Sequence, residues 1–110
     1  MFDLDALFQK SELIPVIIQH VDTKQVLMLG FTNKEAVELT LKTKTAWFWS
    51  RSRQEYWRKG DTSGHAQWVK GVAVDCDGDA LLVSVDQIGA ACHTGDHTCF
   101  DAGRLEVVVG

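Results

Sequence analysis

The sequence predicts a β-rich α+β domain, because runs typical of strands outnumber runs typical of helices. Residues 16–20 and 26–31 are apolar runs joined by a polar turn, the pattern of two adjacent strands. Asp77-Gly78 separates two further apolar runs and is a strong hairpin signal. A chain of 110 residues has the usual size of one domain, so we expect residues 1–110 to fold together.

Two short helices are expected. The first is predicted by apolar residues spaced three and four apart, namely Leu4, Leu7 and Phe8. Pro15 should end the segment that precedes it. The second helix follows Thr32, which forms a capping-box pattern with Glu35. Its buried side is predicted by four apolar residues, Ala36, Val37, Leu39 and Leu41.

The second half of the chain alternates strands with loops. Further strands are predicted over residues 45–50, 68–74, 80–85 and 105–109. Residues 60–64 and 89–103 are rich in small and polar side chains, and we expect both segments to be loops. The longer one has the composition of an ordered functional loop. The order of the strands in a sheet does not follow from these patterns.

The composition counts against some classes of protein, although the basic residues between Arg51 and Lys59 keep a nucleic-acid-binding module as a third alternative. The net charge is −4, with 15 acidic against 11 basic residues, whereas proteins that bind nucleic acids generally present a basic surface. No apolar run approaches the roughly 20 residues that cross a bilayer, so no membrane partner is expected. The acidic start of the chain is unlike a signal peptide. We therefore expect a cytoplasmic protein, whose thiols stay reduced.

The three cysteines favour a metal site. Cys76, Cys92 and Cys99 cannot all pair in one chain, and they lie among aspartates and close to His93 and His97. Thiolates and imidazoles are the ligands that zinc prefers, and three protein ligands leave a fourth position open for water. The alternative is a set of buried thiols that only fill the core.

Three aspartates flank the first cysteine. Asp75, Asp77 and Asp79 alternate, so an uninterrupted strand would direct them to one face and Cys76 to the other. Carboxylates this close repel one another, and a hard cation such as Mg²⁺ would relieve the repulsion. The position of Gly78 does not fit a calcium-binding EF-hand loop. The alternative is a solvated acidic hairpin tip.

A basic segment lies in the middle of the chain. It contains Arg51, Arg53, Arg58 and Lys59. Guanidinium groups bind phosphate oxygens in pairs, and the neighbouring serines and glycines allow backbone N–H groups to approach the same oxygens. A surface strand with basic residues is the alternative, and the P-loop pattern is absent. The nearby aromatic residues are expected in the core rather than as platforms for a base: Trp47, Phe48, Trp49 and Trp57.

Two other histidines carry less chemistry. His65-Ala66-Gln67 begins like the zinc-deaminase signature, but Gln67 cannot replace its catalytic glutamate and no C-x-x-C follows. His20 lies in an apolar strand and is expected to pack there without a chemical role.

Together these segments resemble the phosphoribosyl-AMP cyclohydrolases, enzymes of histidine biosynthesis that open an adenine ring. The resemblance is carried by residues 33–36, 49–53, 57–65, 75–79 and 89–100, and it covers most of the chain. It implies a half-barrel-like α+β domain with a mixed or antiparallel sheet, in an intertwined homodimer. It also implies a single cyclohydrolase domain, without the pyrophosphohydrolase domain to which some relatives are fused.

The resemblance implies two metals. One zinc ion per subunit would be held by Cys76 of one subunit and by Cys92 and Cys99 of the other. Magnesium would be held by Asp75, Asp77 and Asp79. The substrate surface implied by the resemblance contains Arg51, Ser52, Arg53, Lys59, Thr62 and Ser63. Two departures, Ala90 and Thr98, stand at positions that carry no metal ligand.

The implied substrate is a phosphorylated nucleotide, 1-(5-phosphoribosyl)-AMP. Water activated by zinc would add to C6 of its purine, with His93 and His65 as the catalytic histidines and His93 as the proton acceptor. The N1–C6 bond would then open and give the formimino-carboxamide ribotide. The competing hypothesis is a zinc-stabilised dimer that only binds a nucleotide or a protein, with His93 or His97 as fourth ligand.

Overall fold

The computed structural model describes residues 3–60, 64, 66–87, 89, 91–92, 95, 97–100, 103 and 105–106. The elements follow in the order α1 (Leu4–Leu7), β1 (Ile14–His20), β2 (Val26–Thr32), α2 (Lys34–Thr43), β3 (Trp47–Ser50), β4 (Glu55–Arg58), β5 (Gln67–Val74) and β6 (Leu81–Gln87). The predicted β-rich α+β class is therefore confirmed.

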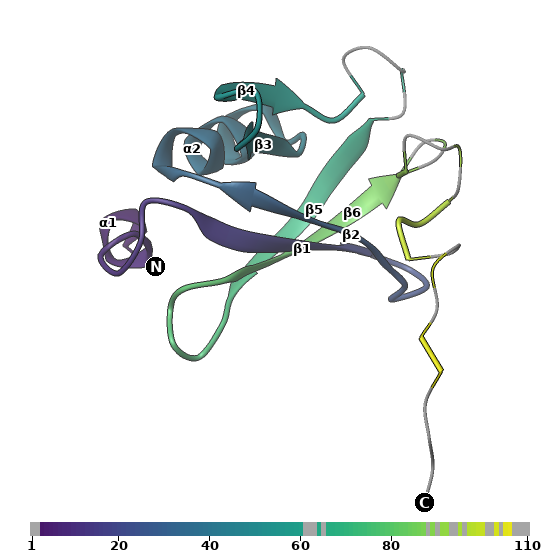
Figure 1. Ribbon diagram of the computed structural model, residues 1–110, viewed down its shortest axis with the longest axis horizontal. Helices are drawn as coiled ribbons and strands as arrows, with labels where there is room; N and C mark the ends of the chain where they lie inside the picture. The colour runs from purple at the N-terminus through teal and green to yellow at the C-terminus, as the bar shows by residue number, and fades with distance from the viewer. Residues whose placement is uncertain are drawn as a thin grey trace, which may run out of the picture.

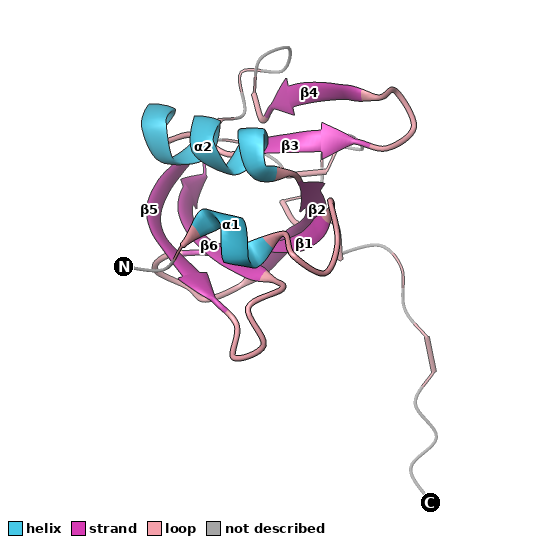
Figure 2. Ribbon diagram, turned by 90° about the vertical axis from the view of Figure 1, so that its left-hand side faces the viewer, coloured by secondary structure: helices cyan, strands magenta, loops and turns pink. Residues whose placement is uncertain are grey.

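Four strands form one mixed sheet in the order β2-β1-β6-β5. The two hairpin pairs, β1 with β2 and β5 with β6, are antiparallel, while β1 and β6 are parallel. The strands β3 and β4 form a separate antiparallel ribbon, which lies beside α2 (Figure 1). The four strands of the main sheet follow one another around a curve, the half-barrel shape implied by the resemblance (Figure 2).

One face of the main sheet forms the core. Ile14, Val16 and Ile18 alternate along β1 and are almost fully buried, because side chains of a strand point to opposite faces in turn. They pack with the buried side chains of the other elements, among them Leu7, Leu27, Met28, Val37, Phe48, Leu81, Val83 and Val85. The predicted N-terminal helix, α1, contributes Leu7 to this core.

The capping-box prediction for α2 was wrong. Asn33 is the N-cap, and its side-chain oxygen accepts a hydrogen bond from the backbone N–H of Ala36 at 3.0 Å. Thr32 is instead the last residue of β2; it is buried, and its hydroxyl donates to the carbonyl of Asn33. The carboxylate of Glu35 accepts a hydrogen bond from the hydroxyl of Tyr56 at 2.6 Å, so it does not return to the cap.

The buried side of α2 also differs from the prediction. Ala36 and Val37 are buried as expected, but the third buried residue is Thr40, and Leu41 is 49% exposed. The hydroxyl of Thr40 donates to the carbonyl of Ala36 and accepts from the backbone N–H of Trp47. A polar residue is thus retained in the core because it joins α2 to β3.

The ribbon packs closely against β2. Phe48 is 1% exposed, and its ring stacks on Trp57 with 4.7 Å between centroids. A Cβ atom on Gly30 would lie 2.5 Å from the Phe48 ring, so only glycine allows this approach. The short strand β4 was not predicted from the sequence.

Two other expectations concern the ends of elements. β1 begins at Ile14, before Pro15, so the expectation that Pro15 ends the preceding segment places the boundary one residue late. Pairing with β6 begins only at Val16, so no ladder bond to β6 is lost at the proline. Leu105 and Glu106 belong to no strand, and residues 107–109 of the expected last strand lie outside the described residues. Within the described part of the chain, no helix is long and apolar enough to cross a membrane.

Candidate active site

The cysteine loop, residues 91–99 as far as they are described, follows β6 and carries two of the three cysteines. The side chains of Cys92 and Cys99 are hydrogen-bonded to each other. Burial raises the pKa of the Cys99 thiol, the neighbouring Cys92 raises it further, and the ammonium group of Lys59 opposes both effects. None of the three cysteines forms a disulfide. The fold therefore brings together two soft ligands from seven residues apart in the sequence.

The end of this loop is bonded to the edge strand β2. The backbone N–H of Cys99 donates to the carbonyl of Leu27 at 2.7 Å. The buried hydroxyl of Thr98 contacts the carbonyls of Val26 and Leu27 at 2.7 and 3.1 Å. Cys99 is thus held by an element far away in the sequence, and the residue is only partly covered by its neighbours.

Lys59 also reaches the cysteine loop. It follows β4, and its ammonium group donates a hydrogen bond to the carbonyl of Ala91. Burial lowers the pKa of Lys59, whereas the negative charge of Cys99 and Cys92 favours its protonated form. The sequence grouped Lys59 with Arg51 in one substrate surface, but the two residues lie at opposite ends of the ribbon, and Lys59 lies beside the thiols.

An open groove of about 540 Å³ lies between β2 and the ribbon. It is lined by Gly30, Phe31, Phe48, Trp49, Ser50, Arg51, Ser52 and Trp57. The guanidinium group of Arg51 lies 3.8 Å from the centre of the Phe31 ring, and the Lys59 nitrogen lies 5.8 Å from the centre of the Trp57 ring. Trp57 therefore connects the groove with the cysteine loop. Phe48 is a core residue as predicted, while Trp49 and Trp57 also border the groove.

The far end of the groove is the turn between β3 and β4. The hydroxyl of Ser50 accepts from the backbone N–H of Arg53 at 3.2 Å and lies 3.4 Å from the hydroxyl of Ser52. Arg53 also forms an exposed ion pair with Glu55 at 3.4 Å. Arg51, Ser52 and Arg53 thus lie together in this turn, and their predicted role in substrate binding stays a prediction. The two other predicted substrate residues, Thr62 and Ser63, lie outside the described residues.

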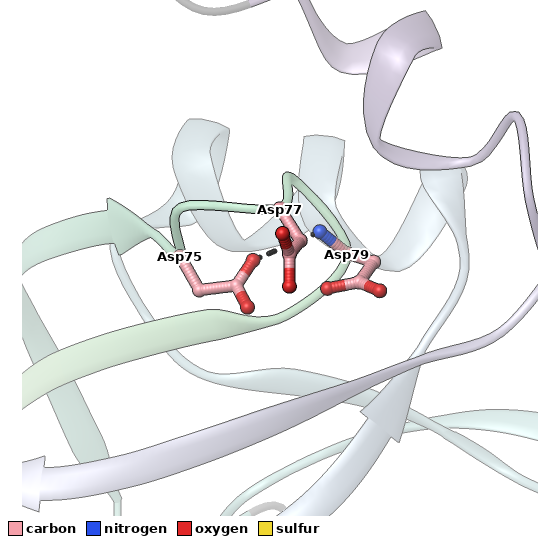
Figure 3. Close-up of side chains that lie close together, drawn as sticks. All are labelled: Asp75, Asp77 and Asp79. Atoms are coloured by element: carbon pink, nitrogen blue, oxygen red, sulfur yellow. Dashed lines mark hydrogen bonds between the residues drawn. The ribbon is translucent and has the colours of Figure 1, made fainter.

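The three aspartates gather in the turn between β5 and β6. Their carboxylate oxygens lie within 4.8 Å of one another, on one side of the turn (Figure 3). They are brought together by a turn and not by the strand alternation considered above, since β5 ends at Val74. The backbone N–H of Asp79 donates to the carboxylate of Asp75 at 3.0 Å and holds the pKa of Asp75 below its usual range.

Cys76 lies in this same turn, far from the other two cysteines. The turn precedes β6 and the cysteine loop follows it, so the two are at opposite ends of the strand (Figure 1). The seven residues of β6 span about 20 Å at about 3.3 Å per residue. A zinc ion lies about 2.3 Å from each sulfur, so a single copy of the chain cannot direct all three cysteines to one ion.

The predicted catalytic histidines, His65 and His93, both lie outside the described residues. His20 has the structural role that was expected, because its Nδ1 accepts a hydrogen bond from the backbone N–H of Asp22 at 3.1 Å. Its ring lies 6.4 Å from that of His97, which belongs to the cysteine loop.

Sequence reasoning missed the contributions of Phe31 and Gln87. Phe31 was read only as the end of a strand, although it stacks under Arg51. The side-chain amide of Gln87 donates to the carbonyls of Gly89 and His97 on either side of Cys92. The sequence held one signal for the contact with Gln87. Alternation along β5 places the polar side chain of Gln67 on the core face, where it meets Gln87.

Comparison with known proteins identifies the family. A sequence profile described as Phosphoribosyl-AMP cyclohydrolase matches residues 28–101. Proteins of that name are 65% identical over 98 residues in Acidothermus cellulolyticus, covering 89% of this chain and 69% of the relative, and 66% identical over 99 residues in Bifidobacterium adolescentis, covering 89% and 73%. A further one, from Clavibacter michiganensis subsp. michiganensis, is 58% identical over 105 residues and covers 96% and 80%. The chain therefore belongs to the phosphoribosyl-AMP cyclohydrolase family.

Proposed function

We propose that this chain hydrolyses the purine ring of 1-(5-phosphoribosyl)-AMP, in histidine biosynthesis, and releases the formimino-carboxamide ribotide. The observation that carries the proposal is the position of the thiol pair, which is joined through Lys59 and Trp57 to an aromatic groove ending in Arg51. Such a groove suits a flat ring with a phosphate at one end and reacting atoms at the other.

The groove offers contacts for both parts of this substrate. Phe31, Trp49 and Trp57 supply apolar surface for the purine. Arg51, with the hydroxyls of Ser50 and Ser52, supplies donors for phosphate oxygens at the turn, where Arg53 adds a second positive charge. Thr62 and Ser63 complete the proposed substrate surface. Lys59 is the third basic residue of the proposed substrate surface. Its position beside the thiols suits the part of the substrate next to the reacting carbon.

The donor set fits zinc. Cys92 and Cys99 are soft ligands that already lie within hydrogen-bonding distance of each other, and zinc prefers such thiolates. The third ligand, Cys76, would come from a second copy, because β6 separates it from the pair within one chain. When bound, zinc with an open position lowers the pKa of a water molecule toward neutrality. Reduced thiols are consistent with the cytoplasm as the site of action.

A second copy has an apolar surface to cover. On the outer face of the main sheet, paired residues form a row across all four strands: Leu29, Ile17, Leu82 and Ala73. Leu29 is 47% exposed and Leu82 is 37% exposed. A hollow of about 210 Å³ continues this row to Asp75, next to Cys76. We propose that the partner subunit packs here in an intertwined homodimer and brings its cysteine pair to Cys76.

Magnesium is proposed at Asp75, Asp77 and Asp79. Their oxygens lie within 4.8 Å of one another, so small rotations of these side chains would let one ion contact all three, and Mg²⁺ prefers carboxylate oxygens. Because Cys76 lies in the same turn, this cation would be close to the shared zinc site and could neutralise a phosphate of the substrate.

Proton transfer is assigned to the two histidines of the family pattern. His93 follows Cys92 directly, and an imidazole with an ordinary pKa near 6.5 is well suited to accept a proton at neutral pH. His65 is the second candidate. Water adds to C6 of the purine and the N1–C6 bond breaks, so N1 must gain a proton as the water loses one. The basic residues hold the substrate in place while this transfer occurs.

The direct test is incubation of the purified chain with 1-(5-phosphoribosyl)-AMP, with ring opening followed by ultraviolet absorbance. We expect turnover that a zinc chelator abolishes and added zinc restores. Cys92→Ser should lose zinc and activity together, while His93→Ala should keep zinc and lose most turnover. Full activity in zinc-free Cys92→Ser protein would refute the assignment. Bound zinc without any turnover would favour a nucleotide-binding dimer instead.

A further inference from the structure

Two glutamine side chains form a relay at the end of the main sheet. Gln67 of β5 and Gln87 of β6 are paired in the antiparallel ladder. The amide nitrogen of Gln67 donates to the amide oxygen of Gln87 at 3.0 Å. This bond fixes which end of the Gln87 amide points outward, because its oxygen is occupied and its NH₂ group must face the opposite way.

The NH₂ group of Gln87 holds the cysteine loop. It donates to the carbonyl of Gly89 and to the carbonyl of His97, both at 3.0 Å. The carbonyl of His97 also accepts from the backbone N–H of Ala91 at 3.1 Å. Gln87 thus joins the backbone before Cys92 to the backbone after it. The second of its two acceptors, the carbonyl of His97, directly precedes Thr98 and Cys99.

The Gln67–Gln87 relay lowers the stability of the folded state. Gln67 is 0% exposed, and its side-chain oxygen has no hydrogen-bond partner among the described residues. An unpaired polar atom in the core destabilises the folded state. Among the described residues, its amide nitrogen has, besides Gln87, only the weak acceptor Met28 Sδ at 3.7 Å. An apolar side chain would therefore suit the core better, and the benefit of Gln67 must lie in what it does to Gln87.

We propose that Gln87, oriented by Gln67, is a positioning residue for the Cys92–Cys99 pair and so sets the zinc affinity of the site. The inference rests on the proposed function, since it assumes that the pair binds zinc. Groups that orient metal ligands through hydrogen bonds typically change metal affinity by 10- to 100-fold when they are removed. Neither glutamine is among the described residues that line the groove, so we assign Gln87 a positioning role and not a catalytic one.

The first test measures zinc affinity by competition with a chelator. Gln87→Met keeps the length of the side chain but removes its hydrogen bonds, and Gln87→Glu keeps the acceptor for Gln67 but cannot donate. We expect both variants to bind zinc about 10-fold or more weakly. Gln54→Glu is the matched control, because Gln54 also donates its amide to a carbonyl, that of Arg51, in a turn away from the cysteines. A loss confined to Gln87→Glu would mean a charge effect and would overturn the proposal.

The second test separates positioning from general stability. Gln67→Met removes the orphaned oxygen together with the bond that orients Gln87. We expect the melting temperature of the zinc-free protein to stay level or rise, while zinc affinity falls by several-fold. If affinity does not fall in this variant, Gln67 has no role in orienting the site and the relay is refuted.

A third measurement needs no zinc. In a Cys76→Ser background, an aromatic disulfide reagent reacts with one thiol of the pair and releases one aromatic thiolate. The second thiol then displaces a second thiolate and closes the Cys92–Cys99 disulfide. We expect Gln87→Met to slow this closure by about 10-fold, the same factor as its loss of zinc affinity. If Gln87→Met slows this closure but the protein with all three cysteines binds no zinc, the positioning role is upheld and the proposed function is rejected. If Gln87→Met changes neither the closure rate nor the zinc affinity, the positioning role is rejected and the proposed function stands.

Discussion

Gly30→Ala is expected to destabilise the fold and to disturb the groove. The added Cβ would lie 2.5 and 2.8 Å from two atoms of the Phe48 ring, whereas carbon atoms pack best at about 3.5–4.0 Å. The ring must therefore move by about 1 Å. It has little room to do so, because it is 1% exposed and stacks on Trp57 at 4.7 Å.

Crowding of this kind in a packed core costs about 1–3 kcal/mol. Replacing glycine by alanine within a strand returns about 0.5–1 kcal/mol. The net loss should lie between about 0 and 2.5 kcal/mol, centred on about 1 kcal/mol, which corresponds to a fall of about 4–8 °C in melting temperature at fixed protein concentration. Because Gly30 and Phe48 both border the groove, KM for the substrate should rise as well.

The control is Gly71→Ala, since a Cβ at Gly71, also within a strand of the main sheet, meets nothing within 4 Å. That variant should be as stable as the parent or slightly more stable. Phe48→Leu should partly rescue Gly30→Ala in a double-mutant cycle, because it removes the atoms that clash. Equal melting temperatures for the two alanine variants would refute the reasoning.

Three further predictions concern charge and assembly. The backbone N–H of Asp79 depresses the pKa of Asp75, so the ionised Asp75 stabilises the fold above the unfolded pKa of Asp75, and this stability is lost as the pH falls below about 4. Asp75→Asn should therefore lose less stability between neutral and acidic pH than the parent, as measured by urea unfolding at a series of pH values. Lys59→Met should slow alkylation of zinc-free Cys99 at neutral pH, because burial then raises the thiol pKa without an opposing ammonium group; an equal rate would contradict this. Leu82→Glu should convert the proposed dimer to monomer in light scattering without unfolding it, since Leu82 is already 37% exposed in the single chain.

Local signals in the sequence predicted the hairpins well. The apolar runs on either side of residues 22–25, and those on either side of Asp77-Gly78, became β1 with β2 and β5 with β6. Turn residues and strand alternation act over a few positions, so they can be read directly. The parallel pairing of β1 with β6 could not be read in this way, because about 60 residues separate the two strands and no local pattern encodes a crossover.

The errors arose where two local readings competed. Thr32 and Asn33 are both good N-cap residues, and the core face of β2 decided between them by burying Thr32. Strand β4 was missed because Arg58 and Lys59 were interpreted only as members of a basic, phosphate-binding segment, and Trp57 was assigned to the core without an element to carry it. Their alternation in fact directs Trp57 to the groove and Arg58 to the other face, where it approaches Trp47.

For the site, the types of the functional residues could be predicted from the sequence, but which of them lie close together in the fold could not. Cys92 and Cys99 are close in sequence, and the loop that joins them brings them together. Cys76 is nearer to Cys92 in sequence than Lys59 is, yet β6 lies between Cys76 and Cys92 and separates them, whereas Lys59 lies beside the thiols. The position of Lys59 depends on where β4 ends relative to the cysteine loop, which only the packing of the ribbon on β2 determines.

The separation of Cys76 from the pair leads to a complementation test. In a two-fold symmetric dimer, each zinc site would take Cys76 from one copy and the pair from the other. Cys76→Ser homodimers and Cys92→Ser homodimers should both be inactive, because every site lacks a ligand. A mixed dimer retains one intact site, in which the Cys92→Ser copy provides Cys76 and the Cys76→Ser copy provides the pair. Random re-association of equal amounts gives one half mixed dimers with one site in two intact, so about a quarter of the parent activity and zinc should return. If the mixture stays inactive although mixed dimers form, the three cysteines do not share a zinc ion across subunits.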